Sequence, residues 1–161
     1  MAKVIMTCGK VCCGKSTYAE RLSREMRAVI LSVDEITLAL FPEGAGELLD
    51  TYVERAEGLL FRISLDIVRM GIDVILDWGF WTREKRDYAR QFYKENGVAC
   101  ELHYLEVPDR LWQQRIAERD RLVENGSVSA YYVDKGLAEK CLEFFQVPDE
   151  NEIDKIIRQE C

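Results

Sequence analysis

The chain has 161 residues, 48% of them hydrophobic, which is enough for one domain with a substantial core. Its formal net charge of -7 argues against a large polyanionic partner, because such a partner requires a basic face. No apolar run of about 18 residues is present, and the short apolar start before Gly9 is not typical of a signal peptide. We therefore expect a cytoplasmic protein without a membrane span, in which the cysteines are reduced.

Apolar runs and helical periodicities alternate along the chain. Buried strands are expected at residues 3–8, 28–33, 72–76 and 98–107. Helices are expected at residues 15–26, 47–70, 83–96, 111–123 and 134–145. The tail DKIIRQ is ambiguous: its isoleucine spacing favours a helix, and a last strand is the alternative. The alternation predicts an α/β domain with a parallel sheet covered on both faces.

Three expected strands end at residues suited to ligand binding. Gly9 follows the first strand, Asp34 the second and Asp77 the third. Ligands of parallel α/β folds bind at the carboxyl ends of the strands. We therefore expect these three regions to converge on one crevice.

The segment from Gly9 to Ser16, GKVCCGKS, fits the pattern G-x-x-x-x-G-K-[ST] between an expected strand and an expected helix. Glycines let successive backbone N–H groups point inward, and the helix adds its positive N-terminal end. Lys15 would reach the outer phosphates, Ser16 would bind Mg²⁺ and Thr17 an inner phosphate. The nucleotide-binding residues predicted here are Gly9, Lys10, Val11, Cys12, Cys13, Gly14, Lys15, Ser16 and Thr17.

Two cysteines occupy variable positions of this pattern. A zinc site needs four ligands, and neither a second cysteine pair nor a nearby histidine is present, since His103 lies within an expected strand. A redox-sensitive loop is a second hypothesis, because a helix N-terminus and Lys15 could lower the pKa of a thiol at Cys12 or Cys13.

Carboxylates after two strands have two interpretations each. Asp34, in SVDE, could accept a proton from an attacking hydroxyl, or it could be a helix N-cap. Asp77, at the end of VILD, could orient Mg²⁺ through water beside the hydroxyl of Ser16.

Arginines recur in the segment WQQRIAERDR. Arg115 and Arg119 are four residues apart and share one helical face. They could belong to a lid, at about residues 111–133, that stabilises a transferring phosphoryl group and excludes water. The alternative is a solvated helix whose arginines pair with neighbouring acidic residues.

The segment DWGFWTREKR follows the third strand. Trp78, Phe80 and Trp81 could line a substrate pocket or equally belong to the core. Arg83 and Arg86 could contact an anionic substrate, but an exposed helix surface is the interpretation we favour for both.

Four stretches taken together, CGKVCCGKSTYAERL, LSVDEI, VILDWGFWTREKRDYAR and FFQVPDENE, resemble the AAA-domain-like small P-loop kinases. This group includes polynucleotide kinase, chloramphenicol phosphotransferase and zeta toxin kinases. The resemblance implies a P-loop NTPase fold, a three-layer α/β/α domain with five parallel strands in the order 2-3-1-4-5. The tail would then supply the fifth strand. The loop departs from the usual GxPGSGKS, because Val11, Cys12 and Cys13 replace the Pro, Gly and Ser.

The resemblance also implies ATP and Mg²⁺ as ligands, Asp34 as the catalytic base, and Arg115 and Arg119 as lid arginines. The function we predict is ATP-dependent phosphorylation of a hydroxyl on a small molecule. A kinase for polynucleotide 5′ ends is one alternative, with a groove near Arg83, Lys85, Arg86 and Arg90, although the acidity of the chain disfavours it. An ATP-binding module without phosphoryl transfer is another.

Overall fold

Five strands and six α-helices form the structure, a computed structural model that describes residues 1–126 and 135–159. The strands are β1 (Lys3–Cys8), β2 (Val29–Ser32), β3 (Val74–Asp77), β4 (Ala99–Glu106) and β5 (Lys155–Arg158). The helices are α1 (Lys15–Met26), α2 (Val33–Leu40), α3 (Leu49–Arg69), α4 (Arg83–Glu95), α5 (Asp109–Glu124) and α6 (Lys135–Phe144). Short 3-10 turns occupy Gly46–Leu48 and Glu150–Glu152.

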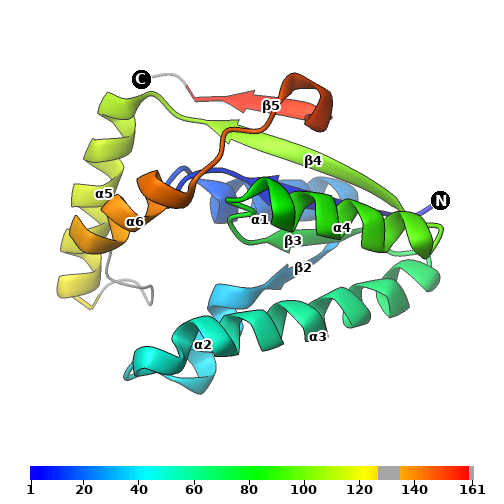
Figure 1. Cartoon of the computed structure of the whole chain (residues 1–161), viewed down its shortest axis with the longest axis horizontal. Coiled ribbons are helices and arrows are strands. Elements are labelled where there is room, and N and C mark those ends of the chain that lie inside the picture. The colour runs from blue at the N-terminus through cyan, green and yellow to red at the C-terminus, as the bar shows by residue number, and fades with distance from the viewer. Residues whose placement is uncertain (127–134, 160–161) are drawn as a thin grey trace.

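The strands form one parallel sheet in the order β2-β3-β1-β4-β5. This is the order that the resemblance implied. All strands therefore end at the same edge, and Figure 1 shows α5 and α6 beyond that edge. Because β1 lies between β3 and β4, the loop that follows β1 is at the centre of the edge.

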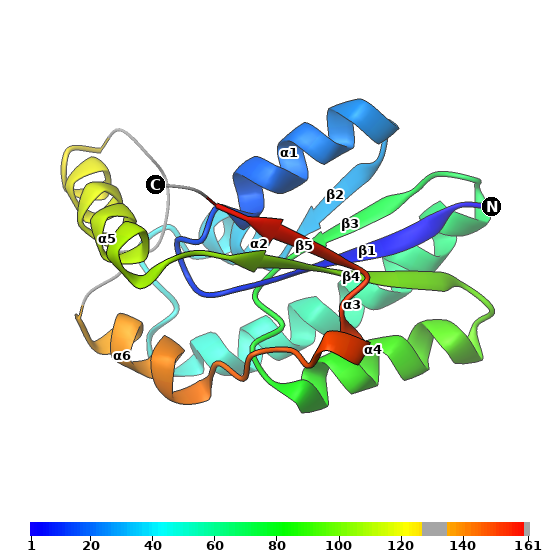
Figure 2. The same ribbon diagram turned by 90° about the horizontal axis from the view of Figure 1, so that it is seen from above.

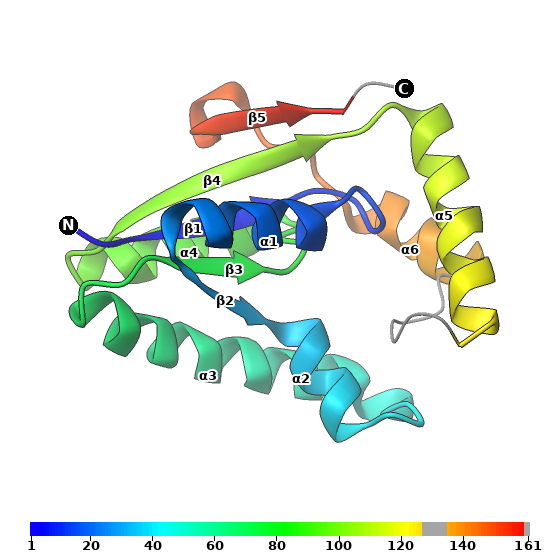
Figure 3. The ribbon, with the colours of Figure 1, turned by 180° about the vertical axis from the view of Figure 1, so that it is seen from behind.

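Helices cover both faces of the sheet, as Figures 2 and 3 show. Side chains alternate along β1, so that Val4 and Met6 pack toward α3 and α4, whereas Ile5 packs toward α1 and α5. Both core clusters are buried, which confirms the predicted three-layer α/β/α architecture. No helix in the described ranges has the length and apolarity that crossing a membrane requires.

The tail differs from the prediction that periodicity made for it. Residues Lys155–Arg158 form β5 and pair with β4, with His103 opposite Lys155 and Glu106 opposite Arg158. The helical interpretation was therefore wrong, and the strand implied by the resemblance is confirmed. Ile153 precedes β5 and packs on one core cluster, whereas Ile157 packs on the other. A short apolar run cannot distinguish this arrangement from a helical one.

A helix that was not among those expected, α2, begins directly after β2. Its N-cap is Ser32, whose hydroxyl accepts a hydrogen bond from the backbone N–H of Glu35 at 3.3 Å. The alternative interpretation of Asp34 as an N-cap was therefore wrong. Asp34 instead lies in the first turn of α2, where its side chain is available to the edge of the sheet.

Candidate active site

A cleft of about 1320 Å³ opens at the carboxyl edge of the sheet. Its loop side consists of Val11, Cys12, residues 14–17 and the facing arginines of α5. Its aromatic side consists of residues 78–82, five residues of α3 between Leu49 and Glu57, and the side chains of Lys85, Lys140 and Phe144. Asp34 and Asp77 lie between the two sides, so the three strand ends do converge on one site.

The loop side is shaped by two residues in the left-handed backbone region, Cys12 with φ 58° and Gly14 with φ 93°. Cys12 stands where the usual loop has a glycine, so this chain adopts the same kind of turn with a side chain present. Helix α1 begins at Lys15, and its free N–H groups therefore point toward the cleft.

Lys15 is held inside the loop by backbone carbonyls. Its Nζ donates to the carbonyl oxygen of Gly9 at 3.2 Å and to that of Lys10 at 2.7 Å. Burial lowers the pKa of Lys15, but the nearby Cys13, Asp77 and Asp34 outweigh this effect and raise it. The ammonium is therefore charged at neutral pH and faces the cleft.

Not every residue of the loop lines the cleft. Val11, Cys12, Gly14, Lys15, Ser16 and Thr17 line it, as predicted. Gly9 and Cys13 instead form the back of the loop: Cys13 is fully buried, and a Cβ on Gly9 would lie 2.5 Å from its Sγ. The side chain of Lys10 turns away to Asp109, at 3.0 Å.

Helix α5 packs against the loop through three side chains on one face. Trp112 Nε1 donates to the carbonyl oxygen of Val11 at 2.6 Å, and Arg115 donates to that of Cys13 at 3.1 Å. Arg119 contacts the Sγ of Cys12 at 3.6 Å. Arg115 and Arg119 therefore face the loop and do not lie on a fully solvated helix face. The expected lid extends into residues 127–133, which lie outside the described residues.

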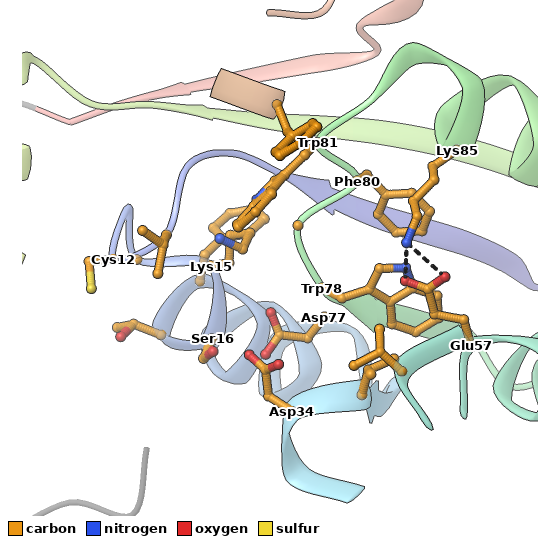
Figure 4. A pocket seen from close by; sticks show the side chains of 18 of the residues that line it. Cys12, Lys15, Ser16, Asp34, Glu57, Asp77, Trp78, Phe80, Trp81 and Lys85 are labelled. Atoms are coloured by element: carbon orange, nitrogen blue, oxygen red, sulfur yellow. Dashed lines mark hydrogen bonds and ion pairs between the residues drawn. The ribbon is translucent and has the colours of Figure 1, made fainter. Parts of the chain in front are cut away.

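Two carboxylates face each other at the centre of the cleft, close to Ser16 (Figure 4). Burial raises the pKa of Asp77, and this effect outweighs hydrogen bonding from Ser16, the charge of Lys15 and hydrogen bonding from Thr7. Desolvation within the cleft raises the pKa of Asp34 as well, and the charge of Lys15 opposes this shift. A carboxylate with a raised pKa is a better proton acceptor.

The aromatic side is both core and pocket wall, so neither of the two interpretations excludes the other. Trp78 and Phe80 are 6% and 2% exposed and stack with ring centroids 5.1 Å apart, yet both border the cleft. Trp81 folds back over Gly79, where a Cβ would lie 2.2 Å from the indole Nε1. The absence of a side chain at position 79 therefore allows the three rings to gather there.

Arg86 was expected on the exposed surface of a helix, and that expectation was wrong. It is 1% exposed and pairs with Glu152, with Nε to Oε1 at 2.8 Å. It also donates to the carbonyl oxygens of Phe80, Trp81 and Gln146. Arg86 therefore joins the aromatic segment to the C-terminal segment. Arg83, in contrast, is exposed as expected and pairs with Asp149 at 2.6 Å.

Sequence reasoning did not identify two contributions to the site. Trp112 precedes Arg115 by three residues, so the helical spacing that linked the arginines could also have included it. Asp50, Glu54 and Glu57 border the cleft from one face of α3. Their spacing of four and three residues was visible in the sequence, but charged helix faces usually point to solvent.

Four of the described cysteines lie in or next to the loop, whereas Cys100 lies on β4 opposite Val4. The five within the described residues are free thiols: Cys8, Cys12, Cys13, Cys100 and Cys141. Burial raises the pKa of the Cys12 thiol in spite of the charge of Arg119 and its hydrogen bond. This direction is opposite to the one that the redox hypothesis requires.

The fold and the loop define a P-loop protein. Residues 4–135 match the AAA domain family, and the chain belongs to this family. A comparison with curated proteins gives no match.

Solved structures share the fold at low sequence identity. A sugar kinase from Janibacter sp. is 15% identical, with a TM-score of 0.69 over 98% of this chain and 86% of that one. The APS kinase of Mycobacterium tuberculosis, in complex with AMPPNP and APS, is 17% identical, with a TM-score of 0.70 over 99% and 90%. A gluconokinase from Sinorhizobium meliloti is 13% identical, with a TM-score of 0.70 over 97% and 82%.

Proposed function

We propose that the protein is a kinase that transfers the terminal phosphate of ATP to a hydroxyl group of a small molecule. The observation that carries this proposal is the position of Asp34, which lies between a P-loop and a second, aromatic-lined side of the same cleft. A protein that only bound ATP would not need a carboxylate and an additional pocket next to the end of the triphosphate. The solved structures that share the fold include kinases, which supports the same function.

Each side of the cleft has a role in this reaction. The N–H groups of the loop and the Lys15 ammonium would bind the phosphates, and Arg115 and Arg119 would stabilise the charge that develops during transfer. Asp34 would accept the proton of the acceptor hydroxyl while that oxygen attacks the terminal phosphorus and the bond to ADP breaks. The balance is one ATP and one alcohol to one ADP, one phosphate ester and one proton.

The donors between the two sides fit Mg²⁺. Ser16 and Asp77 are hydrogen bonded and supply hard oxygen atoms, and Asp34 faces them. No group of three or more His, Cys, Asp or Glu side chains suited to a metal occurs within residues 1–126 and 135–159. This is consistent with a magnesium ion bound mainly by phosphates and water, with Ser16 and Asp77 beside it. Such an ion would neutralise phosphate charge.

The basic residues that a polynucleotide groove would use have acidic partners. Lys85 pairs with Glu57, Arg83 with Asp149, Arg86 with Glu152 and Arg90 with Asp154. Ion-paired cations release few counterions when a nucleic acid binds, so they contribute little affinity. This pairing supports a small acceptor over a polynucleotide end.

An Asp34→Asn variant tests the proposal. We expect ADP release in the presence of an acceptor to fall by about 10²–10⁴-fold, because the general base is lost. The affinity for a non-hydrolysable ATP analogue should change little, since the loop and Lys15 are intact.

Glu35→Gln is the matched control, because Glu35 is the next residue of α2 and does not border the cleft. It should keep the wild-type rate. Full turnover in Asp34→Asn would refute the assigned role of Asp34. ATP binding without ADP release, across a broad set of alcohols, would instead favour the non-catalytic module.

A further inference from the structure

The wall of the cleft that faces the aromatic segment is acidic. Asp50, Glu54 and Glu57 are spaced by four and three residues on α3, and all three border the cleft. Asp34 adds a fourth carboxylate at the base of the same space. A second molecule bound on the aromatic side would therefore lie along a row of carboxylates.

The two lysines on this side are already paired. Lys85 Nζ contacts both carboxylate oxygens of Glu57, at 2.9 and 3.0 Å, as Figure 4 shows. Lys140 Nζ lies 3.4 Å from Asp50 Oδ2. Glu54 has no ion pair or hydrogen bond with any other described residue. Three carboxylates of α3 thus face two ammonium groups, which leaves the carboxylate of Glu54 in excess, while Asp34 lies near the Lys15 ammonium.

The opposite wall is aromatic. Trp78, Phe80 and Trp81 border the cleft on the 78–82 segment, and Phe144 borders it from α6. The faces of aromatic rings attract cations, most strongly those of tryptophan, and they also pack against apolar faces of ring-shaped alcohols. A space between aromatic faces and an unpaired carboxylate suits an organic ammonium group.

We propose that the acceptor is an alcohol that carries a protonated amine, and that Glu54 is the counter-ion of that amine. This inference rests on the proposed kinase function, since it names the substrate class of the same cleft. The hydroxyl would approach Asp34 while the ammonium lies toward Glu54 and the aromatic rings. Acceptors with phosphate, sulfate or carboxylate groups would meet the unpaired Glu54 carboxylate on this side, where the two described lysines are already paired.

Matched sets of ligands test this charge preference. In each set, each charged member differs from the neutral member at one position: glucosamine, glucose and glucuronate; galactosamine, galactose and galacturonate; ethanolamine, ethylene glycol and glycolate. Binding is measured by isothermal titration calorimetry on the full chain with a non-hydrolysable ATP analogue and Mg²⁺ present. We expect amines to bind at least about tenfold more tightly than their neutral counterparts, and the carboxylates to bind most weakly.

Substitutions of Glu54 assign the preference to one side chain. Glu54→Gln should remove the advantage of the amine, and Glu54→Lys should reverse it in favour of the carboxylate in each set. Asp66→Asn is the control, because Asp66 lies on the same helix, is exposed and pairs only locally with Arg69. This variant should keep the preference of the wild type.

The inference fails if no amine binds, if neutral or anionic members bind as well as amines, or if Glu54→Gln leaves the difference intact. ADP release with the same ligands separates this result from the proposed function. Transfer only to neutral or anionic alcohols would refute the preference for amines but not the proposed kinase function. Tight amine binding without transfer to any alcohol would refute the kinase function but not the preference for amines.

Discussion

The two sides of the cleft are built in different ways. The loop side comes from one continuous stretch, residues 11–17, to which α5 adds side chains. The aromatic side gathers α3, the segment after β3, α4 and α6, which are far apart in the sequence. A phosphate is recognised by backbone N–H groups that one local turn supplies, whereas recognition of an acceptor depends on side chains that only packing brings together.

The largest effect that we expect comes from Arg86, which holds the aromatic side in place. Arg86→Met should lower the free energy of unfolding by about 3–5 kcal/mol, because it leaves Glu152 buried without its partner. Urea unfolding measures this change. Burial raises the pKa of Glu152, but hydrogen bonds from Arg86 and from the backbone of Asp149 outweigh this effect and hold the pKa below its usual value. The stabilisation is therefore fully present above that usual value and is lost as the pH falls from it through the lowered pKa.

Arg83→Met is the matched control for this prediction. Arg83 lies on the same helix, three residues earlier, and its pair with Asp149 is exposed. Its loss should change the free energy of unfolding far less than the loss of Arg86, because solvent screens an exposed ion pair. Equal effects of the two substitutions would mean that the buried pair does not hold the C-terminal segment to the aromatic segment.

On the loop side, Arg119→Gln should lower the rate of phosphoryl transfer by about 10²-fold, because one cation next to the transferring group is lost. The rate of ADP release at saturating ATP measures the effect. Arg121→Gln is the control: Arg121 lies two residues further on the same helix, pairs with Glu118 at 2.8 Å and does not border the cleft. Identical rates for both variants would show that Arg119 takes no part in phosphoryl transfer.

The smallest effect that we expect is on stability, because the buried carboxylate of Asp77 lowers the free energy of unfolding when it is charged. Its pKa is raised by burial, so the folded state binds the proton more tightly than the unfolded chain does. Stability of the wild type should therefore fall as the pH rises from the usual pKa of 3.8 through the raised value. Asp77→Asn should gain about 1 kcal/mol at neutral pH and nothing at low pH, while it loses activity.

Thermal unfolding as a function of pH measures this difference. The wild type and Asp77→Asn should converge at acid pH and separate as the pH rises. Asp66→Asn, an exposed position, should follow the wild type throughout. Parallel curves for the wild type and Asp77→Asn would show that the Asp77 carboxylate carries no stability cost.

Much of the fold was accessible from the sequence because its signals are local. Buried strands and amphipathic helices produce their own periodicities, and Gly14, Lys15 and Ser16 are adjacent in the chain. The tail shows where this reasoning stops. Three isoleucines within five residues suit a helix, but pairing with β4 satisfies the backbone of residues 155–158 as a strand.

The sequence by itself determined the P-loop, the alternation of strands and helices, and the carboxylates that follow β2 and β3. These features depend on residues that are neighbours along the chain, where backbone geometry and spacing are enough. Only the tertiary structure decided that Arg86 is buried, that α5 packs on the loop, and that an acidic face of α3 opposes three aromatic rings. The sequence does not show whether a charged side chain is exposed to water or paired with another residue, because this depends on how distant segments pack.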